Sequence, residues 1–285
     1  MHIVLSRKSM DSRFGGYPSP IMPDGTLIPF PIPQVLTQEN NPYSKIYATE
    51  DKTFAQLFRT FNDSRSQIIR PFIKNGKKKD YAKNCHLDPD LFKESKTRIK
   101  GWRPSLGQVN QANSHLKSFG IGKESNALFL FFGWFRKVKR NKKNNKLQFY
   151  GEHYHLIYAY LEVEKRIDID LNEKFPKWAE DHPHIQSAQI ESISNNSLYI
   201  AKDKSTLINA PGSQILKFDN KRILTAPGET RSRWKLPEKF KKVKISYHES
   251  PSVWKEKYFQ SNPIGQEFVF EENKGVINWA KKIVS

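Results

Sequence analysis

Residues 127–135, ALFLFFGWF, form the longest apolar run in the chain, and residues 147–163, LQFYGEHYHLIYAYLEV, follow after a strongly basic segment. Both stretches are rich in aromatic and branched side chains, which favour β-strands. The first run is far shorter than the roughly 20 residues that a membrane-spanning helix requires. We therefore predict a central β-hairpin whose exposed tip is the basic segment at residues 136–146.

Shorter segments on either side of this hairpin predict the remaining elements. Residues 53–61, TFAQLFRTF, place apolar side chains at helical spacing, and Thr53 is in position to cap that helix. The many glycines and prolines between residues 15 and 33 exclude a long helix there. The other expected elements are strands at residues 2–5, 197–201 and 215–218, and helices at residues 107–119, 175–182 and 276–284.

The order of these elements indicates the fold class. Strands and short helices are interspersed, without an internal repeat or a recognisable linker. The pattern predicts an α+β fold, a single domain over residues 1–285 built around a mixed, largely antiparallel β-sheet with flanking short helices. A division near residue 120 is the alternative that the pattern leaves open.

The composition points to a folded protein with an anionic partner. The 285 residues include 48 Lys and Arg against 29 Asp and Glu, a formal net charge of +19. Such a charge attracts DNA or nucleotides, although biased genome composition is an alternative source of it. With 37% hydrophobic and 13% aromatic residues, the chain does not have the composition of a disordered protein.

Cysteine content bears on the cellular compartment. Cys85 is the only cysteine, which excludes a secreted scaffold held by disulfides. The apolar run near the start of the chain is too short for a signal peptide. We therefore expect a cytoplasmic protein that does not enter a membrane.

The basic residues cluster in the sequence, and three clusters stand out. Residues 136–146 carry seven cationic side chains in eleven, residues 231–244 interleave cations with aromatic rings, and residues 74–83 form a third cluster. Cations beside aromatic rings can contact phosphates while the rings stack on bases, but they are equally typical of a solvated face around core aromatics. The candidate nucleic-acid-binding residues are Arg136, Lys137, Lys139, Arg140, Arg231, Arg233 and Trp234.

The segment CHLDPD, residues 85–90, is the densest group of reactive side chains. Side chains in an extended segment point to the same side at every second residue, so His86, Asp88 and Asp90 are expected to share one side. An imidazole with two carboxylates suits acid/base catalysis or a divalent cation held by Asp88 and Asp90. The alternative is that the aspartates cap a helix that begins near Leu91.

Two further polar groups are candidates. Arg7 and Lys8 follow the first strand, and cations, hydroxyls and exposed amides at a strand end suit a phosphate or carboxylate. His153 and His155 share one face of a strand, where two imidazoles can bind a metal or simply form a polar sheet face. No P-loop or dinucleotide-binding glycine motif is present. Besides Arg7 and Lys8, the candidates for binding the phosphate or carboxylate are Asp11, Ser12, Gly15 and Gly16.

Taken together, several segments resemble the nucleotide modification associated domain 3 family. The resemblance is carried in matching order by LSRKSMDSRFGGYPSPIMPDGTLIPFPIP (5–33), HLDPD (86–90), GQVNQANSHL (107–116), LFLFFGWFR (128–136), WAEDHPH (178–184), TAPGETRSRWKLP (225–237), ISYH (245–248) and GQEFVF (265–270). It implies a role near modified nucleotides or DNA and leaves the reaction open. The basic insertion at residues 136–146 departs from the usual pattern.

The same resemblance implies roles for individual residues. It assigns a ligand-facing loop to Arg7, Lys8, Asp11, Gly15 and Gly16. It assigns a polar centre to His86, Asp88, Asp90, Gln108, His115 and His153.

The leading hypothesis is an enzyme that acts on a nucleotide or a DNA base. Arg7 and Lys8 would hold phosphate, while the His/Asp group of residues 86–90 would transfer protons or bind a divalent ion. One alternative is a non-catalytic reader of modified DNA, in which Trp102, Trp134 or Trp234 stacks on a base. A second alternative is a metal-dependent nuclease that restricts foreign DNA, since paired carboxylates can hold a metal that activates water.

Overall fold

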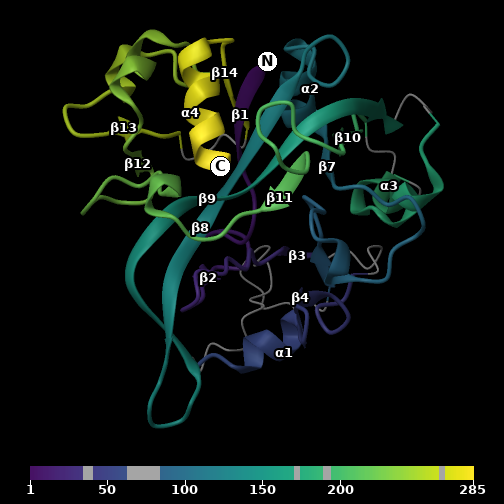
Figure 1. The fold of residues 1–285 in the computed structure, drawn as a ribbon, viewed down its shortest axis with the longest axis vertical. Coiled ribbons are helices and arrows are strands. Elements are labelled where there is room, and N and C mark those ends of the chain that lie inside the picture. Colours follow the sequence, from purple (N-terminus) through teal and green to yellow (C-terminus); the bar gives the residue numbers. More distant parts are fainter. Residues whose placement is uncertain (35–40, 63–83, 170–173, 189–193, 263–266) are drawn as a thin grey trace, which may run out of the picture.

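The structure is a computed structural model that describes residues 1–34, 41–62, 84–169, 174–188, 194–262 and 267–285. A curled eight-stranded sheet lies at its centre (Figure 1). The strands are β1 (His2–Arg7), β2 (Ser19–Ile21), β7 (Ser105–Gln108), β8 (Ala127–Arg140), β9 (Leu147–Asp168), β10 (Ser197–Ala201), β11 (Ser213–Ile215) and β14 (Glu267–Phe270).

Their order across the sheet is β14-β1-β8-β9-β10-β7, with β2 added to β8 and β11 added to β9. β1 and β2 run parallel to β8, and the other pairs are antiparallel. This arrangement confirms the predicted α+β fold around a mixed, largely antiparallel sheet.

Smaller elements surround the sheet. No helix within the described ranges is long and apolar enough to cross a membrane. Two-stranded ribbons are formed by β3 (Ile32–Gln34) with β6 (Asn84–His86), β4 (Tyr47–Thr49) with β5 (Lys52–Thr53), and β12 (Arg233–Trp234) with β13 (Phe259–Gln260). The helices are α1 (Phe54–Arg59), α2 (Asn110–Ser118), α3 (Pro183–Ala188) and α4 (Lys274–Val284), with short 3-10 turns at Lys93–Ser95, Lys177–Asp181, Asn220–Arg222, Glu238–Lys242 and Pro251–Val253.

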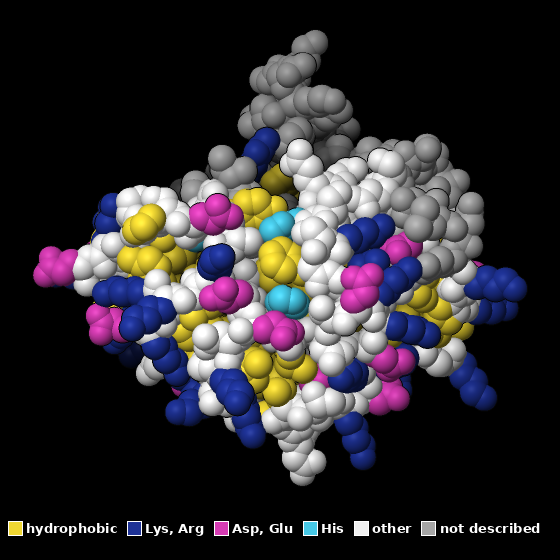
Figure 2. All heavy atoms as spheres, turned by 90° about the horizontal axis from the view of Figure 1, so that it is seen from above, with side chains coloured by type: hydrophobic (Ala, Val, Ile, Leu, Met, Phe, Trp, Pro, Cys, Tyr) yellow, Lys and Arg dark blue, Asp and Glu magenta, His cyan; other side chains and the backbone are white. Residues whose placement is uncertain are grey.

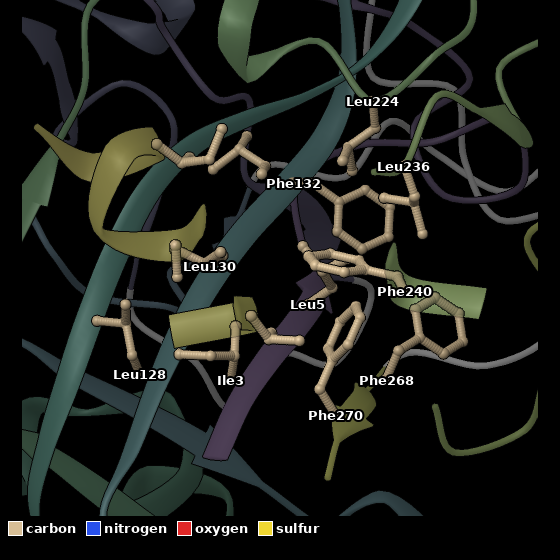
Figure 3. Packing of buried hydrophobic residues seen from close by; sticks show 14 of the residues in the cluster. Ile3, Leu5, Leu128, Leu130, Phe132, Leu224, Leu236, Phe240, Phe268 and Phe270 are labelled. Atoms are coloured by element: carbon tan, nitrogen blue, oxygen red, sulfur yellow. The ribbon is translucent and has the colours of Figure 1, made fainter. Parts of the chain in front are cut away.

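The alternation of side chains along β8 divides the core between the two faces of the sheet. Leu128, Leu130 and Phe132 point to one face, where they pack with β1 residues and with α4 (Figure 3). Phe129 and Phe131 point to the other face, where the cluster includes Leu116 of α2. We call these the α4 face and the α2 face. Both are buried, so β8 reads as an almost continuous apolar run.

Several predicted elements are confirmed. Thr53 caps α1 in a reciprocal arrangement with Gln56, and α1 buries its apolar stripe. The strands at residues 2–5 and 197–201, the central hairpin and the C-terminal helix are also present. The predicted helix at 107–119 begins too early, because Gly107 and Gln108 pair with β10 in strand β7. At residues 175–182 the helix is a 3-10 turn, and of residues 215–218 only Ile215 belongs to a strand.

The basic tip is shorter than predicted. β8 continues to Arg140 and β9 begins at Leu147, so only residues 141–146 form the turn. The ammonium group of Lys139 on β8 lies 5.4 Å from the centre of the Tyr150 ring on β9, a cation–π contact between the two strands beyond their apolar part. The basic cluster at residues 74–83 lies outside the described residues.

The far end of β9 is tied to neighbouring elements through Asp168. Only 2% of Asp168 is exposed, and its carboxylate accepts a 2.5 Å hydrogen bond from Ser197 and lies 3.1 Å or less from the charged nitrogens of Lys117, Lys123 and Arg166. Burial opposes ionisation, but these donors and cations hold the pKa of Asp168 well below its usual value.

We expect Asp168→Asn to lower the free energy of unfolding by about 2 kcal/mol at pH 7, because a charged acceptor is lost. The wild-type advantage requires an ionised carboxylate, so it is complete above the unfolded-state pKa of about 3.9 and declines as the pH falls below that value. Urea unfolding of both proteins at pH 7 and at lower pH checks this. A difference that stays constant with pH would contradict it.

Candidate active site

The Asp88 carboxylate lies at the centre of a buried polar cluster. Its Oδ1 accepts a 2.6 Å hydrogen bond from the Gly107 backbone N–H, and the Lys8 ammonium is 3.5 Å from Oδ2. Two imidazoles also face it. His182 Nε2 lies 3.5 Å from Oδ1, and His184 Nε2 lies 3.9 Å from Oδ2. Because only 2% of the Asp88 side chain is exposed, these groups take the place of solvent around its charge.

A second carboxylate, Glu267, joins this cluster through Lys8. Its Oε1 is 3.7 Å from the Lys8 ammonium and accepts hydrogen bonds from Ser6 Oγ at 3.0 Å and from Gln108 Nε2. Strands β1, β7 and β14 therefore each contribute a polar side chain to one place on the α2 face. We call the whole set the Asp88 centre: Lys8, His86, Asp88, Gln108, His182, His184 and Glu267.

Local alternation explains why His86 and Asp88 belong to the same site. Cys85 and Leu87 are buried in a separate hydrophobic cluster with Phe30. Side chains at intervening positions of an extended segment point the opposite way, which directs His86 and Asp88 toward the imidazoles. The ring centres of His86 and His184 are 5.2 Å apart.

Two glycines allow the backbone to approach the site closely. A Cβ atom at Gly107 would lie 2.2 Å from Cδ2 of His184, so only glycine lets this imidazole lie against β7. A Cβ atom at Gly133 would lie 2.6 Å from the carbonyl oxygen of Lys8. Larger residues at either position would displace a member of the Asp88 centre.

Burial and charge set the protonation states. Burial alone would raise the pKa of Asp88, but Lys8 and the neighbouring imidazoles outweigh it and lower that pKa to about 2. Burial lowers the pKa of His184 to about 4 and that of His182 well below its ordinary value, against the opposing effect of Asp88. Burial also raises the pKa of Glu267. At neutral pH Asp88 is ionised and both imidazoles are neutral.

Asp88 also lines a pocket with a volume of about 540 Å³. Ser9 and Tyr158 line it beside Asp88, and aromatic rings including Phe54 and Phe92 form part of its wall. Three buried polar atoms near this region have no hydrogen-bond partner within the described chain, namely Ser9 Oγ, His182 Nε2 and Glu267 Oε2. Unsatisfied buried groups of this kind mark places where a ligand or ion can bind.

Asp90 does not join the Asp88 centre, which corrects the expectation that three polar residues share one side. Its two carboxylate oxygens each accept a 2.6 Å hydrogen bond from Arg98, and Trp102 Nε1 donates a third at 3.2 Å. β6 ends at His86, and the backbone of Asp90 instead pairs with Ser105, so regular alternation stops before it. Asp90 is a structural partner of Arg98 and caps no helix.

Arg7 and Lys8 lie on opposite faces of the sheet, because neighbouring residues of an extended strand alternate. Lys8 reaches the Asp88 centre on the α2 face. Arg7 lies near Arg231 and His155 on the α4 face: burial, Arg231 and Arg7 together lower the pKa of His155 well below its ordinary value. The expectation that Arg7 and Lys8 hold one phosphate together does not fit this geometry.

The loop after β1 belongs to this second region. Asp11 accepts hydrogen bonds from the backbone N–H groups of Arg13 and Phe14, and Ser12 Oγ accepts one from Arg231 at 2.5 Å. Gly15 and Gly16 both have positive φ, as a tight turn of this loop requires. Of the loop residues predicted to face a ligand, Arg7, Asp11 and Ser12 therefore lie near Arg231.

Arg231 heads a small cationic and aromatic surface. Its guanidinium lies 4.0 Å from the centre of the Trp134 ring, and Trp134 Nε1 donates a 2.8 Å hydrogen bond to His153. Burial and the charges of Arg136 and Arg231 lower the pKa of His153. We call Trp134, Arg136 and Arg231 the Trp134 surface. His153 borders it and lies away from the Asp88 centre, contrary to expectation.

The other predicted residues also lie elsewhere. Trp234 is 1% exposed in the core of the α4 face, so it cannot stack on a base. Arg233 forms a 2.8 Å ion pair with Glu229. His115 contacts Ser246 and lies beside Tyr247, so it does not belong to the Asp88 centre as expected. In Figure 2, Lys and Arg side chains are spread over the visible face among acidic ones.

Sequence reasoning missed three members of the Asp88 centre. The sequence places His182 and His184 in the segment WAEDHPH and Glu267 in the segment GQEFVF, both of which carry the family resemblance, but assigns no site role to any of the three. The signal for Glu267 was a carboxylate directly before the apolar residues of β14. For His182 and His184 the signal was that a single residue separates them. That spacing does not indicate that the two imidazoles meet Asp88, which lies in a distant part of the sequence.

We expect Arg98→Met to lower the free energy of unfolding by about 3 kcal/mol, because it leaves the buried Asp90 carboxylate without its cation. Arg233→Met removes an ion pair that is partly open to solvent, where screening weakens it, and should cost clearly less than Arg98→Met. Urea unfolding of both variants checks the difference. Equal losses would show that Asp90 is not held as described.

Comparisons with known proteins identify the family. No curated protein and no solved structure matches the chain. A family model described as nucleotide modification associated domain 3 matches residues 2–271, and this match covers the Asp88 centre and the Trp134 surface. The name of the family indicates involvement in nucleotide modification. The chain therefore belongs to the nucleotide modification associated domain 3 family.

Proposed function

We propose that the protein is an enzyme that modifies a nucleobase, either in DNA or in a free nucleotide, at the Asp88 centre. The observation that carries this proposal is an ionised carboxylate buried beside two neutral imidazoles and an ammonium group, next to a pocket of about 540 Å³. Buried titratable groups held in different protonation states are typical of acid/base catalysis.

The pocket suits a planar, uncharged group. Its wall combines aromatic rings with three acidic side chains besides Asp88: Asp24, Glu50 and Asp51. The described residues that line it include no Lys or Arg, so phosphate groups find no cation there. A base can enter between the rings while its sugar and phosphates stay outside, as in enzymes that flip a base out of a duplex.

The groups of the centre divide the chemical work. Asp88 is ionised, and its low pKa suits it to stabilise positive charge on a neighbouring imidazole more than to take up a proton itself. The neutral imidazoles are the groups that can accept a proton or donate one from a ring N–H. The ammonium group of Lys8 does not line the pocket; it lies between the two carboxylates and keeps Asp88 ionised. Gln108 and Ser6 hold Glu267 in position beside Lys8.

This proposal predicts that Asp88→Asn lowers the turnover of modification at least about a hundredfold, because the imidazoles lose the negative charge on which their acid–base role depends. The readout is mass spectrometry of nucleosides from DNA and of a nucleotide pool, each incubated with purified protein and divalent ions. A mass change that only the wild type produces would support the proposal.

The matched control is Asp219→Asn, an exposed aspartate that pairs with Lys221 and belongs neither to the Asp88 centre nor to the lining of the pocket, which should retain wild-type turnover. Circular dichroism confirms that each variant is folded. Equal mass changes with Asp88→Asn and wild type would overturn the assignment of the active site. No mass change with either protein, together with intact DNA binding, would favour the non-catalytic reader.

The Trp134 surface supports contact with a polynucleotide. Arg136 and Arg231 are close enough to His153 to influence its pKa, and Arg231 covers an indole ring. Cations combined with an aromatic ring suit the backbone and bases of a single strand. Because this surface lies on the α4 side of β8, a polymer bound here would contact the protein at a place separate from the Asp88 centre.

We expect Arg136→Ala/Arg231→Ala to weaken the binding of single-stranded DNA and to reduce the slope of log affinity against log salt by about 1 to 2, one for each phosphate that the variant no longer neutralises. Fluorescence anisotropy over a salt series measures both. Lys221→Ala, which removes a cation elsewhere, should have a smaller effect. A similar effect of both variants would indicate that net charge alone drives binding.

A further inference from the structure

Three side chains of the Asp88 centre have the composition and spacing of a metal site. One ligand atom each from His86, Asp88 and His184 lies within 4.8 Å of the other two. Neither His184 nor His182 forms a good hydrogen bond with the Asp88 carboxylate, because their Nε2 atoms lie 3.9 Å and 3.5 Å from it. An ion between His184 Nε2 and Asp88 Oδ2 could bind both atoms at once.

Neighbouring residues orient two of these ligands. His184 Nδ1 is 3.0 Å from Asn196 Oδ1, an acceptor, so Nδ1 carries the proton and Nε2 presents its lone pair to Asp88. Asn196 also donates a 2.9 Å hydrogen bond to the His184 carbonyl, which fixes its own orientation. The Gly107 N–H holds Asp88 Oδ1 and leaves Oδ2 directed at His184.

His182 differs from His184 in this respect. Its Nδ1 accepts a 3.3 Å hydrogen bond from the His184 backbone N–H, so its proton resides on Nε2, the atom that faces Asp88. His182 is therefore set to donate toward the carboxylate or toward a molecule bound near it. It is not oriented as a third imidazole ligand.

We propose that His86, Asp88 and His184 bind one divalent transition metal ion, of the Zn²⁺ or Fe²⁺ class. Two imidazoles with one carboxylate favour such ions over Mg²⁺ and Ca²⁺, which prefer oxygen ligands. Three protein ligands leave coordination positions open for water or substrate, as in catalytic sites. Asp90, which the sequence suggested as a ligand, is held by Arg98 and takes no part.

Lys8 competes with the ion for Asp88. Its ammonium is 3.5 Å from Asp88 and 3.7 Å from Glu267, a carboxylate whose Oε2 has no hydrogen-bond partner within the described chain. When the ion binds, the ammonium can shift toward Glu267 and keep a carboxylate partner. The paired carboxylates thus allow the site to hold either the lysine alone or the lysine and a metal.

The test is titration of the metal-free protein with Co²⁺, followed by visible absorbance, and with Zn²⁺, followed by calorimetry. Wild type should bind one ion, and His86→Ala and His184→Ala should each weaken binding by at least about tenfold. Lys8→Met should tighten it, because a competing positive charge is removed. His153→Ala, an exposed histidine bordering the Trp134 surface, should bind as wild type does.

Circular dichroism and thermal melting of each variant separate loss of the site from loss of the fold. Absence of saturable binding by wild type, or equal weakening by His153→Ala and His184→Ala, would overturn the proposal. The inference shares its site with the proposed function, yet this readout needs no turnover. A protein that binds the ion but modifies no base would reject only the enzyme, and one that modifies a base without binding an ion would reject only the metal.

Discussion

The antiparallel pairing of β8 with β9 is the constraint on which the rest of the molecule depends. These two strands are long enough to support hydrophobic clusters on both faces, and β1, β2, β10 and β11 all pair with one of them. Alternation along β1 then sends Arg7 to one face and Lys8 to the other. The alternation of side chains along extended backbone thus places the Asp88 centre and the Trp134 surface on opposite faces of the sheet.

The Asp88 centre resolves an electrostatic conflict that its composition creates. Burying a carboxylate is unfavourable unless cations and hydrogen-bond donors replace water. Here one ammonium lies between two carboxylates, and a backbone N–H holds the one with the lower pKa. The asymmetry gives Asp88 and Glu267 different protonation behaviour, although both are buried. On the opposite face the guanidinium of Arg231 instead lies against the face of the Trp134 indole ring.

The sequence predicts the elements better than the site, for physical reasons. The apolar run that became β8 and the capped stripe of α1 are local patterns, so hydrophobicity and spacing suffice to find them. His86 and Asp88 could be grouped because they are two residues apart. His182, His184 and Glu267 reach the same place through tertiary packing, which no spacing encodes. Asp90 does not join the site as predicted, because it forms an ion pair with Arg98, eight residues later. Trp234 does not stack on a base as predicted, because its indole ring is buried in the core.

One pairing also bears on how the chain matures. β1 precedes the other strands of the central sheet along the chain, and one of its two neighbours is β14, the last of them; the hydrogen bond from Ser6 to Glu267 spans 261 residues. Closing so long a loop is slow relative to forming the hairpin, because the entropy of closure must be overcome first. A nascent chain on the ribosome can therefore assemble the central hairpin early, while Glu267 reaches Lys8 only after β14 has also emerged.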